Sequence, residues 1–176
     1  MNSSMKQILM ELQGVADALP ESAVKACAEK INAHSRIFVY GAGRSGLMLR
    51  ALAMRLMQMG KCVYVVGETV TPAIGEGDLL VLASASGNTH SVCHYAGTAK
   101  SCGANLLIIT AAESSALTDI QAADMRFSVP DKDSAAAGGQ VMGSLFEQTL
   151  LLFGDAVVQC LAADSQMMRK NHANLE

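Results

Sequence analysis

The chain has 176 residues, enough for one domain with a full hydrophobic core but barely enough for two. Charged residues make up 16% of it, well below the roughly 25% of an average soluble domain, so we expect part of the surface to be buried in a homo-oligomer. The net charge of −3 argues against a nucleic-acid partner, and no apolar run is long enough to predict a membrane span.

The N-terminal stretch and the cysteines indicate the compartment. Polar residues occur throughout residues 1–12, which do not resemble a secretory signal. The five cysteines are scattered without a C-x-x-C pair (Cys27, Cys62, Cys93, Cys102 and Cys160). This pattern predicts reduced thiols and a cytoplasmic location. Because several of them lie in apolar stretches, we expect small buried hydrophobic side chains rather than nucleophiles.

Helical and strand patterns alternate along the chain after an N-terminal helical region. Apolar residues at helical spacing predict two helices within residues 3–33, separated near Pro20. Five short apolar runs predict strands, at 36–40, 61–66, 78–83, 105–110 and 125–129. The segments between them predict helices at 47–59, 90–102 and 117–122. A long final helix is expected over 143–163, followed by a polar tail, 164–176.

The order of these elements predicts the fold class. Strands that alternate with helices need crossover connections, which favour a parallel sheet. The runs at 36–40, 78–83 and 105–110 are almost entirely apolar, as in strands covered by helices on both faces. We therefore expect a single α/β domain over 1–176, with a doubly wound five-stranded parallel sheet and the N-terminal helices packed on it.

Two loops, each directly after an apolar strand, carry residue types that bind phosphate. The first, Gly41-Ala-Gly-Arg-Ser-Gly46, opens a helix, so the free N–H groups of the first turn face any anion there. The second, Ser84-Ala-Ser-Gly-Asn-Thr89, offers three hydroxyls around a glycine. In open parallel sheets, ligands bind at the carboxyl ends of the strands, where the strand order reverses. The predicted phosphate-binding residues are Gly41, Gly43, Arg44, Ser45, Ser84, Ser86, Gly87, Asn88 and Thr89.

Other interpretations of these loops are open. The glycines of the first loop satisfy the dinucleotide fingerprint G-x-G-x-x-G, with Glu68 near the expected position ~20 residues on. Arg44 and Ser45 inside that pattern, together with the second loop, favour a monophosphate instead. Both loops could also be ordinary turns, with Asn88 or Thr89 as helix caps. The occurrence of two such loops after apolar strands favours a ligand.

The two loops together resemble the signature of the sugar isomerase (SIS) domain family. Thr69-Val-Thr-Pro-Ala73 and Gly77-Asp78 also fit that family, whereas Gly143-Ser-Leu-Phe-Glu-Gln148, Asp155 and His172-Ala-Asn-Leu-Glu176 resemble its 6-phospho-3-hexuloisomerase branch. The resemblance covers nearly the whole chain. It implies a flavodoxin-like sheet and the interconversion of D-arabino-3-hexulose 6-phosphate and fructose 6-phosphate in the ribulose monophosphate pathway. It also implies a homotetramer, and neither metal nor organic cofactor.

Glu147 is the candidate catalytic base. Moving a sugar carbonyl between C3 and C2 needs a base beside the ketone, a group that shuttles hydroxyl protons and stabilisation of a cis-enediol. Glu147 lies in an otherwise apolar segment, where burying a carboxylate without compensation is costly. A surface glutamate of a helix is the alternative. Arg44 could neutralise the phosphate or an enediolate oxygen, with a bidentate reach that lysine lacks.

His172 is the second catalytic candidate, and only the resemblance supports it. Imidazole titrates in the right range for an acid–base group, or for the group that opens the sugar ring. By composition alone, His172 would be a solvated histidine of the tail. If the tail folds into a site, it can complete the pocket of a neighbouring subunit and so link activity to oligomerisation.

Further alternatives concern the substrate and a metal. Asn88 and Ala85 depart from the loop that the resemblance leads us to expect, so arabinose 5-phosphate or a heptose phosphate stays open as substrate. A non-catalytic phosphosugar sensor would need neither Glu147 nor His172, and this chain has no room for the DNA-binding module usual in sensors. His90 and His94 lie one helical turn apart, a spacing that can bind metal, but no third ligand is visible.

Overall fold

The computed structural model describes residues 3–129, 139–161 and 164–175. Its centre is a sheet of five parallel strands in the order β2-β1-β3-β4-β5. The strands are β1 (Arg36–Gly41), β2 (Cys62–Val65), β3 (Leu79–Ser84), β4 (Asn105–Thr110) and β5 (Met125–Arg126). The predicted α/β class and five-stranded parallel sheet are confirmed.

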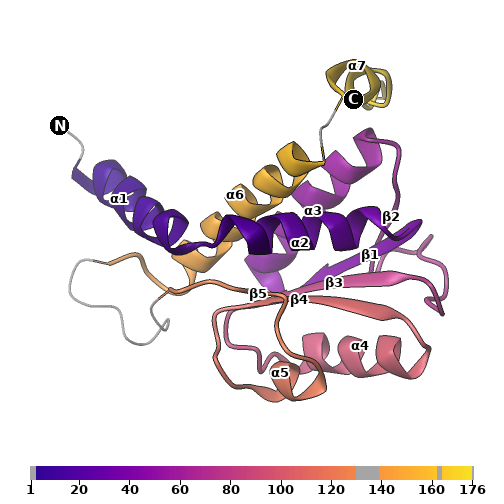
Figure 1. The fold of residues 1–176 in the computed structure, drawn as a ribbon, viewed down its shortest axis with the longest axis horizontal. Coiled ribbons are helices and arrows are strands. Elements are labelled where there is room, and N and C mark those ends of the chain that lie inside the picture. Colours follow the sequence, from indigo (N-terminus) through magenta and orange to yellow (C-terminus); the bar gives the residue numbers. More distant parts are fainter. Residues whose placement is uncertain (1–2, 130–138, 162–163, 176) are drawn as a thin grey trace.

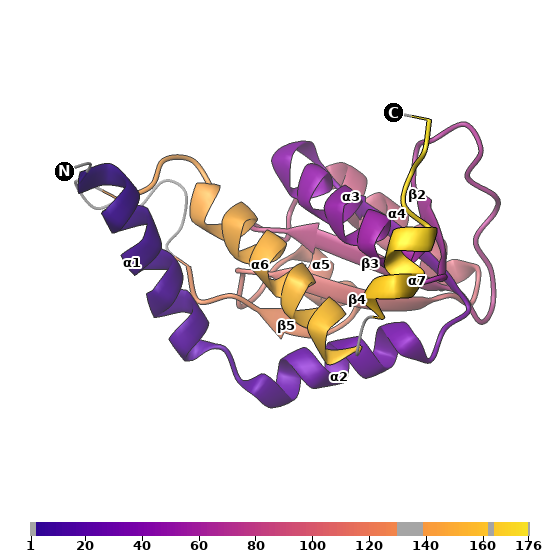
Figure 2. The same ribbon diagram turned by 90° about the horizontal axis from the view of Figure 1, so that it is seen from above.

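Helices cover both faces of the sheet (Figure 1). One core lies between the sheet and α1 (Ser3–Ala18), α2 (Glu21–Asn32), α3 (Gly43–Gln58) and α6 (Ser144–Cys160). The other core lies between the sheet and α4 (His90–Ser101) and α5 (Ala116–Ile120). The short α7 (Ser165–Lys170) packs near the C-terminal end of α3 (Figure 2). No helix in the described ranges is long and apolar enough to cross a membrane.

The apolar strands are explained by this two-sided burial. Every residue of β3 is buried. Successive side chains of a strand point to opposite faces, so Leu79 and Val81 enter the core with α3 and α6, whereas Leu80 and Leu82 enter the core with α4. A strand that serves two cores has no solvent face, which is why its sequence does not alternate between apolar and polar residues.

The strand order places a reversal between β1 and β3. From β1 the chain crosses through α3 to β2 on one side, and from β3 it crosses through α4 to β4 on the other. Gly41 at the end of β1 pairs in register with Ala83 near the end of β3. The loops 41–46 and 84–89 therefore leave neighbouring strands at the point where parallel sheets bind ligands.

Some predicted boundaries differ from the structure. Helix α3 begins at Gly43 and not at residue 47, because its first turn is built from glycine and polar residues that carry no apolar period. The predicted strand 125–129 pairs only over Met125–Arg126. The polar tail contains α7, which the sequence pattern did not indicate. The predicted end of the last helix, at residue 163, lies outside the described residues.

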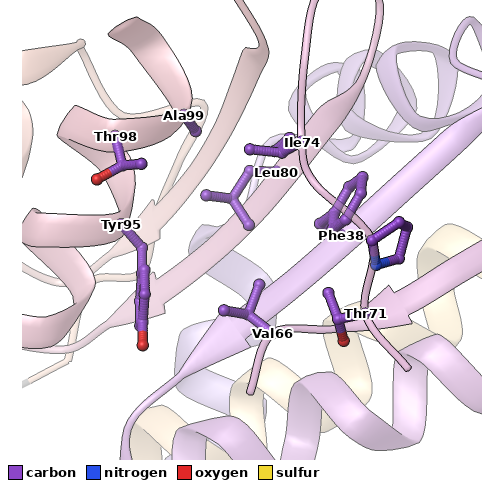
Figure 3. A pocket seen from close by; sticks show the side chains of 9 residues that line it. Phe38, Val66, Thr71, Ile74, Leu80, Tyr95, Thr98 and Ala99 are labelled. Atoms are coloured by element: carbon purple, nitrogen blue, oxygen red, sulfur yellow. The ribbon is translucent and has the colours of Figure 1, made fainter. Parts of the chain in front are cut away.

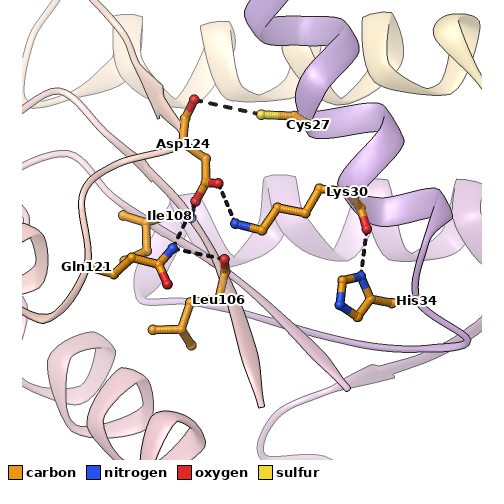
Figure 4. Close-up of polar contacts among 7 residues, drawn as sticks. All are labelled: Cys27, Lys30, His34, Leu106, Ile108, Gln121 and Asp124. Atoms are coloured by element: carbon orange, nitrogen blue, oxygen red, sulfur yellow. Dashed lines mark hydrogen bonds and ion pairs between the residues drawn. The ribbon is translucent and has the colours of Figure 1, made fainter. Parts of the chain in front are cut away.

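A polar cluster ties α2 to the sheet beneath it (Figure 4). Lys30 of α2 forms an ion pair with Asp124, with 2.5 Å between Nζ and Oδ1. The other carboxylate oxygen of Asp124 accepts hydrogen bonds from the backbone N–H of Ile108, at 2.8 Å, and from Nε2 of Gln121. Because the carboxylate is satisfied from both sides, it fixes α2 and the start of β5 relative to β4.

The cysteines are less buried than the sequence suggested. All five are free thiols. Cys27 is buried, and burial raises the pKa of its thiol to about 12, which makes it unreactive. Cys93 is half-buried, but Cys62, Cys102 and Cys160 are exposed. The expectation of small buried side chains is wrong for these three, because each lies at the end of an element rather than in its middle.

Arg36 and Asp78 form an ion pair at the amino-terminal edge of the sheet. Nε of Arg36 lies 2.7 Å from Oδ1 of Asp78, and the backbone N–H of Gly75 donates to Oδ2 at 2.8 Å. These donors, Arg36 first, hold the pKa of the buried Asp78 carboxyl below its ordinary value. The pair therefore contributes stability that is fully present above about pH 4 and is lost as the pH falls through the folded-state pKa.

We expect Asp78→Asn to lower the free energy of unfolding at pH 7 by about 1–2 kcal/mol, a value discounted for the partly exposed arginine. The difference between wild type and variant should shrink in acid, as Asp78 of the wild type becomes protonated. Urea unfolding of both proteins from pH 7 to pH 3 measures it, with Asp119→Asn, an exposed carboxylate, as control. A difference that does not change with pH would contradict this role of the ion pair.

Candidate active site

The first loop brings helix α3 unusually close to strand β1. A Cβ atom on Gly46 would lie 2.2 Å from the carbonyl oxygen of Gly41, and one on Gly41 would lie 2.9 Å from the backbone nitrogen of Gly46. Both glycines are thus required for packing of the helix against the strand. The predicted contact of Gly41 with a phosphate stays a prediction.

The start of α3 is open to a ligand. Gly43 has a φ of 57° and no heavy atom within 4 Å of the position of a Cβ, and Ala42 before it provides no side-chain cap. Gly43 and Arg44 are exposed, whereas Ser45 is buried. The first N–H groups of a helix have no acceptor within the helix and carry partial positive charge, so this end of α3 suits an anion.

The second loop is held by its own hydroxyls. Oγ of Ser84, a buried residue, accepts a hydrogen bond from the backbone N–H of Gly87 at 3.1 Å and lies 3.0 Å from Oγ1 of Thr89. Oγ of Ser86 accepts from the backbone N–H of Asn88 at 3.2 Å, and Ser86 is exposed. Ser84 therefore shapes the loop, while Ser86 and the half-buried Thr89 present hydroxyls near its surface.

The structure joins two residues that the sequence had singled out separately. Nε of Arg44, at the start of α3, forms an ion pair with Oε2 of Glu147, in the first turn of α6. The Glu147 side chain is only 16% exposed, whereas that of Arg44 is 60% exposed. The interpretation of Glu147 as a freely solvated surface glutamate does not fit this burial. A shielded carboxylate and an accessible guanidinium therefore lie together at the mouth of the first loop.

His172 lies at the other end of the molecule. It follows α7, and Nδ2 of the preceding Asn171 donates to the carbonyl of Gln58, the last residue of α3, at 3.0 Å. Arg44 stands near the first residue of α3, and a helix of 16 residues is about 24 Å long. Both views of the ribbon place α7 beside the far end of α3 (Figures 1 and 2). Within one chain, His172 and Glu147 are not brought together.

The other sequence candidates lie outside this site. Glu68, the acid of the possible dinucleotide fingerprint, forms an ion pair with Arg50 at 2.6 Å. The rings of His90 and His94 stack on α4 with centroids 6.5 Å apart. In the part of the chain that the structure describes, no group of three or more His, Cys, Asp or Glu side chains could hold a metal ion.

An apolar pocket of about 100 Å³ lies on the α4 face (Figure 3). Phe38 and Leu80 of the sheet, Tyr95 of α4 and Val66 after β2 are among its lining residues, none of which is charged. A phosphate is held best by cationic groups and converging N–H donors. The lining of this pocket has no cationic side chain, so it does not suit a phosphosugar.

The loop after β4 packs against the second loop and was not found from the sequence. A Cβ on Gly87, which has a φ of 64°, would lie 2.1 Å from Oγ of Ser115. Ser115 is held in turn by a capping box with Thr118 at the start of α5. The spacing Ser-x-x-Thr before a short helix is the signal that could have identified this segment.

This arrangement, two loops at the reversal of strand order and a half-buried carboxylate paired with Arg44 of the first loop, defines a class of protein. The family model of the SIS domain matches residues 30–154, well over half of the chain. The chain belongs to the SIS domain family, as the resemblance of its loops had predicted.

Within that family, named relatives are similar over nearly the full length. The 3-hexulose-6-phosphate isomerase of Bacillus subtilis is 41% identical over 97% of this chain and 96% of its own length. That of Mycobacterium gastri is 41% identical over 94% of this chain and 86% of its own. A crystal structure from Methanococcus jannaschii, from which the same function was inferred, matches 98% of this chain and 97% of its own with a TM-score of 0.78 and 32% identity.

Proposed function

We propose that this chain interconverts D-arabino-3-hexulose 6-phosphate and fructose 6-phosphate, the activity for which the similar enzymes are named. The observation that supports it most is the pairing of Glu147 with Arg44 beside the two loops. A binding module would need the loops but not a half-buried carboxylate next to them. The site thus combines a phosphate anchor with a group able to move a proton.

These residues support the following course of the reaction. With the phosphate at the start of α3 and at the loop 84–89, Glu147 removes the proton on C3 of fructose 6-phosphate. The electrons form the C2–C3 double bond of a cis-enediolate, and the C2 oxygen takes up negative charge that the accessible guanidinium of Arg44 stabilises. Return of the proton to C2, with transfer of a hydroxyl proton from O3 to O2, yields the 3-ketose.

The reaction is tested by following fructose 6-phosphate in D₂O by NMR, with purified protein and no added cofactor. We expect deuterium at C3 and the appearance of a 3-ketohexose 6-phosphate. Binding without exchange would indicate a phosphosugar sensor and contradict an isomerase. Exchange with arabinose 5-phosphate or a heptose phosphate, and none with fructose 6-phosphate, would mean that the chain isomerises that other phosphosugar.

Phosphate binding by the loop 84–89, called the phosphate loop below, can be tested separately. We expect the double variant Ser84→Ala with Ser86→Ala to bind fructose 6-phosphate about thirtyfold more weakly. Each substitution removes a hydrogen bond worth about 1 kcal/mol, that of Ser84 within the loop and that of Ser86 to the phosphate. Isothermal titration calorimetry measures the change. Ser101→Ala, at the opposite end of α4, is the matched control. Wild-type affinity in the double variant would mean that the phosphate binds elsewhere.

The assembly and the compartment stay predictions. We propose a cytoplasmic homotetramer that acts on a small phosphosugar without metal or organic cofactor. Exposed apolar side chains on three helices support an oligomer, among them Met10 of α1, Leu47 of α3 and Leu152 of α6. An oligomer would also let the tail 164–176 reach the site of a second copy.

A further inference from the structure

The phosphate loop 84–89 is fastened from outside by the segment 110–117, which runs from the end of β4 into α5. The backbone N–H of Ala111 donates to the carbonyl of Ala85 at 3.2 Å, and the backbone N–H of Leu117 donates to the carbonyl of Gly87 at 3.0 Å. Between these two bonds, Ser115 packs against Gly87 so closely that no Cβ fits there. The loop has little freedom to change shape unless this segment moves with it.

Two side chains take part in this set of bonds: Oγ1 of Thr110 donates to the carbonyl of Ala85 at 3.3 Å, and Asn88 bonds to α5. Its Oδ1 accepts a hydrogen bond from the backbone N–H of Ala116 at 2.9 Å. Ala116 is the first residue of α5, so this N–H has no acceptor within its own helix. Asn88 thus caps α5, a helix that begins 28 residues further along the chain, and not α4, which begins two residues after it.

We infer that Asn88 is a positioning residue of the phosphate site, a role that rests on the proposed function. Its acceptor oxygen is engaged with Ala116, and its backbone N–H is engaged with Ser86. Asn88 acts through α5, which holds the carbonyl of Gly87 and thereby the hydroxyls of Ser86 and Thr89 on either side. The phosphate is then held by the hydroxyls of Ser86 and Thr89 and by the start of α3, while Asn88 keeps the loop in place.

Two substitutions remove the same hydrogen bond from opposite ends. Asn88→Ala removes the acceptor, and Ala116→Pro removes the donor without changing any side chain of the loop. Proline is well tolerated at the first position of a helix. Ser115 before it has φ −168° and ψ 166°, the extended conformation that a residue before proline adopts. Ala116 is exposed, so the ring enters solvent and not the core.

We expect each variant to raise the Kd and the KM for fructose 6-phosphate about fivefold, the effect of one neutral hydrogen bond. The kcat should stay within about twofold, because the bond affects anchoring of the phosphate and not the proton transfer. The double variant should bind fructose 6-phosphate no more weakly than either single variant, since both substitutions remove the same hydrogen bond. Ser114→Ala, an exposed hydroxyl of the same segment, is the matched control and should behave as wild type.

Calorimetric Kd values, kinetics and thermal unfolding of the wild type and the four variants decide the inference. A higher Kd and KM with Asn88→Ala but not with Ala116→Pro would mean that Asn88 touches the phosphosugar itself, which would overturn the inference. Additive effects, or a lower melting temperature with unchanged Kd and KM, would overturn it as well. Because Kd does not depend on turnover, a wild-type chain that binds but does not isomerise would count against the proposed function alone.

Discussion

Glu147→Gln should lower kcat about a thousandfold while the Kd for fructose 6-phosphate changes little. Removing a general base typically costs 10²–10⁴-fold in rate, and glutamine keeps the shape of the side chain without its ability to take a proton. The phosphate anchors lie on other elements, the start of α3 and the loop after β3, so binding should persist. Turnover in the NMR assay and calorimetric affinity measure the two effects separately.

This experiment needs a control for the charge balance at Arg44, because Glu147→Gln also removes the ion-pair partner of Arg44. Arg44→Lys keeps a cation near Glu147 but loses the planar guanidinium. Glu29→Gln, an exposed glutamate of α2, tests whether loss of any helix carboxylate matters. If Glu147→Gln turns over like wild type, Glu147 is not the base, and the pair with Arg44 has only a structural function.

The fold could be predicted because its signals are local. The run Asp78–Ala83 has no polar residue after its first, and such a run indicates a strand between two layers wherever it lies in the chain. Gly41 and Gly46 likewise mark a close approach of strand and helix. The position of the two loops then followed from the general rule for parallel sheets.

The composition of the site depends on contacts that no local pattern contains. Arg44 and Glu147 are 103 residues apart in the chain, and only the packing of α6 beside α3 makes them partners. Asn88 looked like a cap of the helix that follows it, whereas the structure uses it for α5. The role of His172 is the least predictable, because a tail residue has no periodic pattern and its placement depends on how copies of the chain assemble.

That dependence can be tested by combining two inactive variants. If His172 acts in the site of a neighbouring subunit, Glu147→Gln and His172→Ala should each be inactive alone and should recover activity when mixed. In a mixed pair, one site carries both substitutions and the other carries neither. Random mixing in equal amounts makes half of the pairs mixed, so about a quarter of wild-type activity should return, given symmetric pairs of subunits.

The structure gives the physical reason to expect recovery. Asn171 and α7 hold His172 beside the end of α3, about one helix length of 24 Å from Arg44 and Glu147. No rotation of one side chain crosses that distance, so a catalytic His172 must come from a second copy or from a displaced tail. The variants are unfolded together, refolded and assayed, with each variant refolded alone as the control. A mixture that stays inactive, while refolded wild type regains activity, would show that His172 serves its own chain. Full activity of His172→Ala refolded alone would show that His172 has no catalytic role.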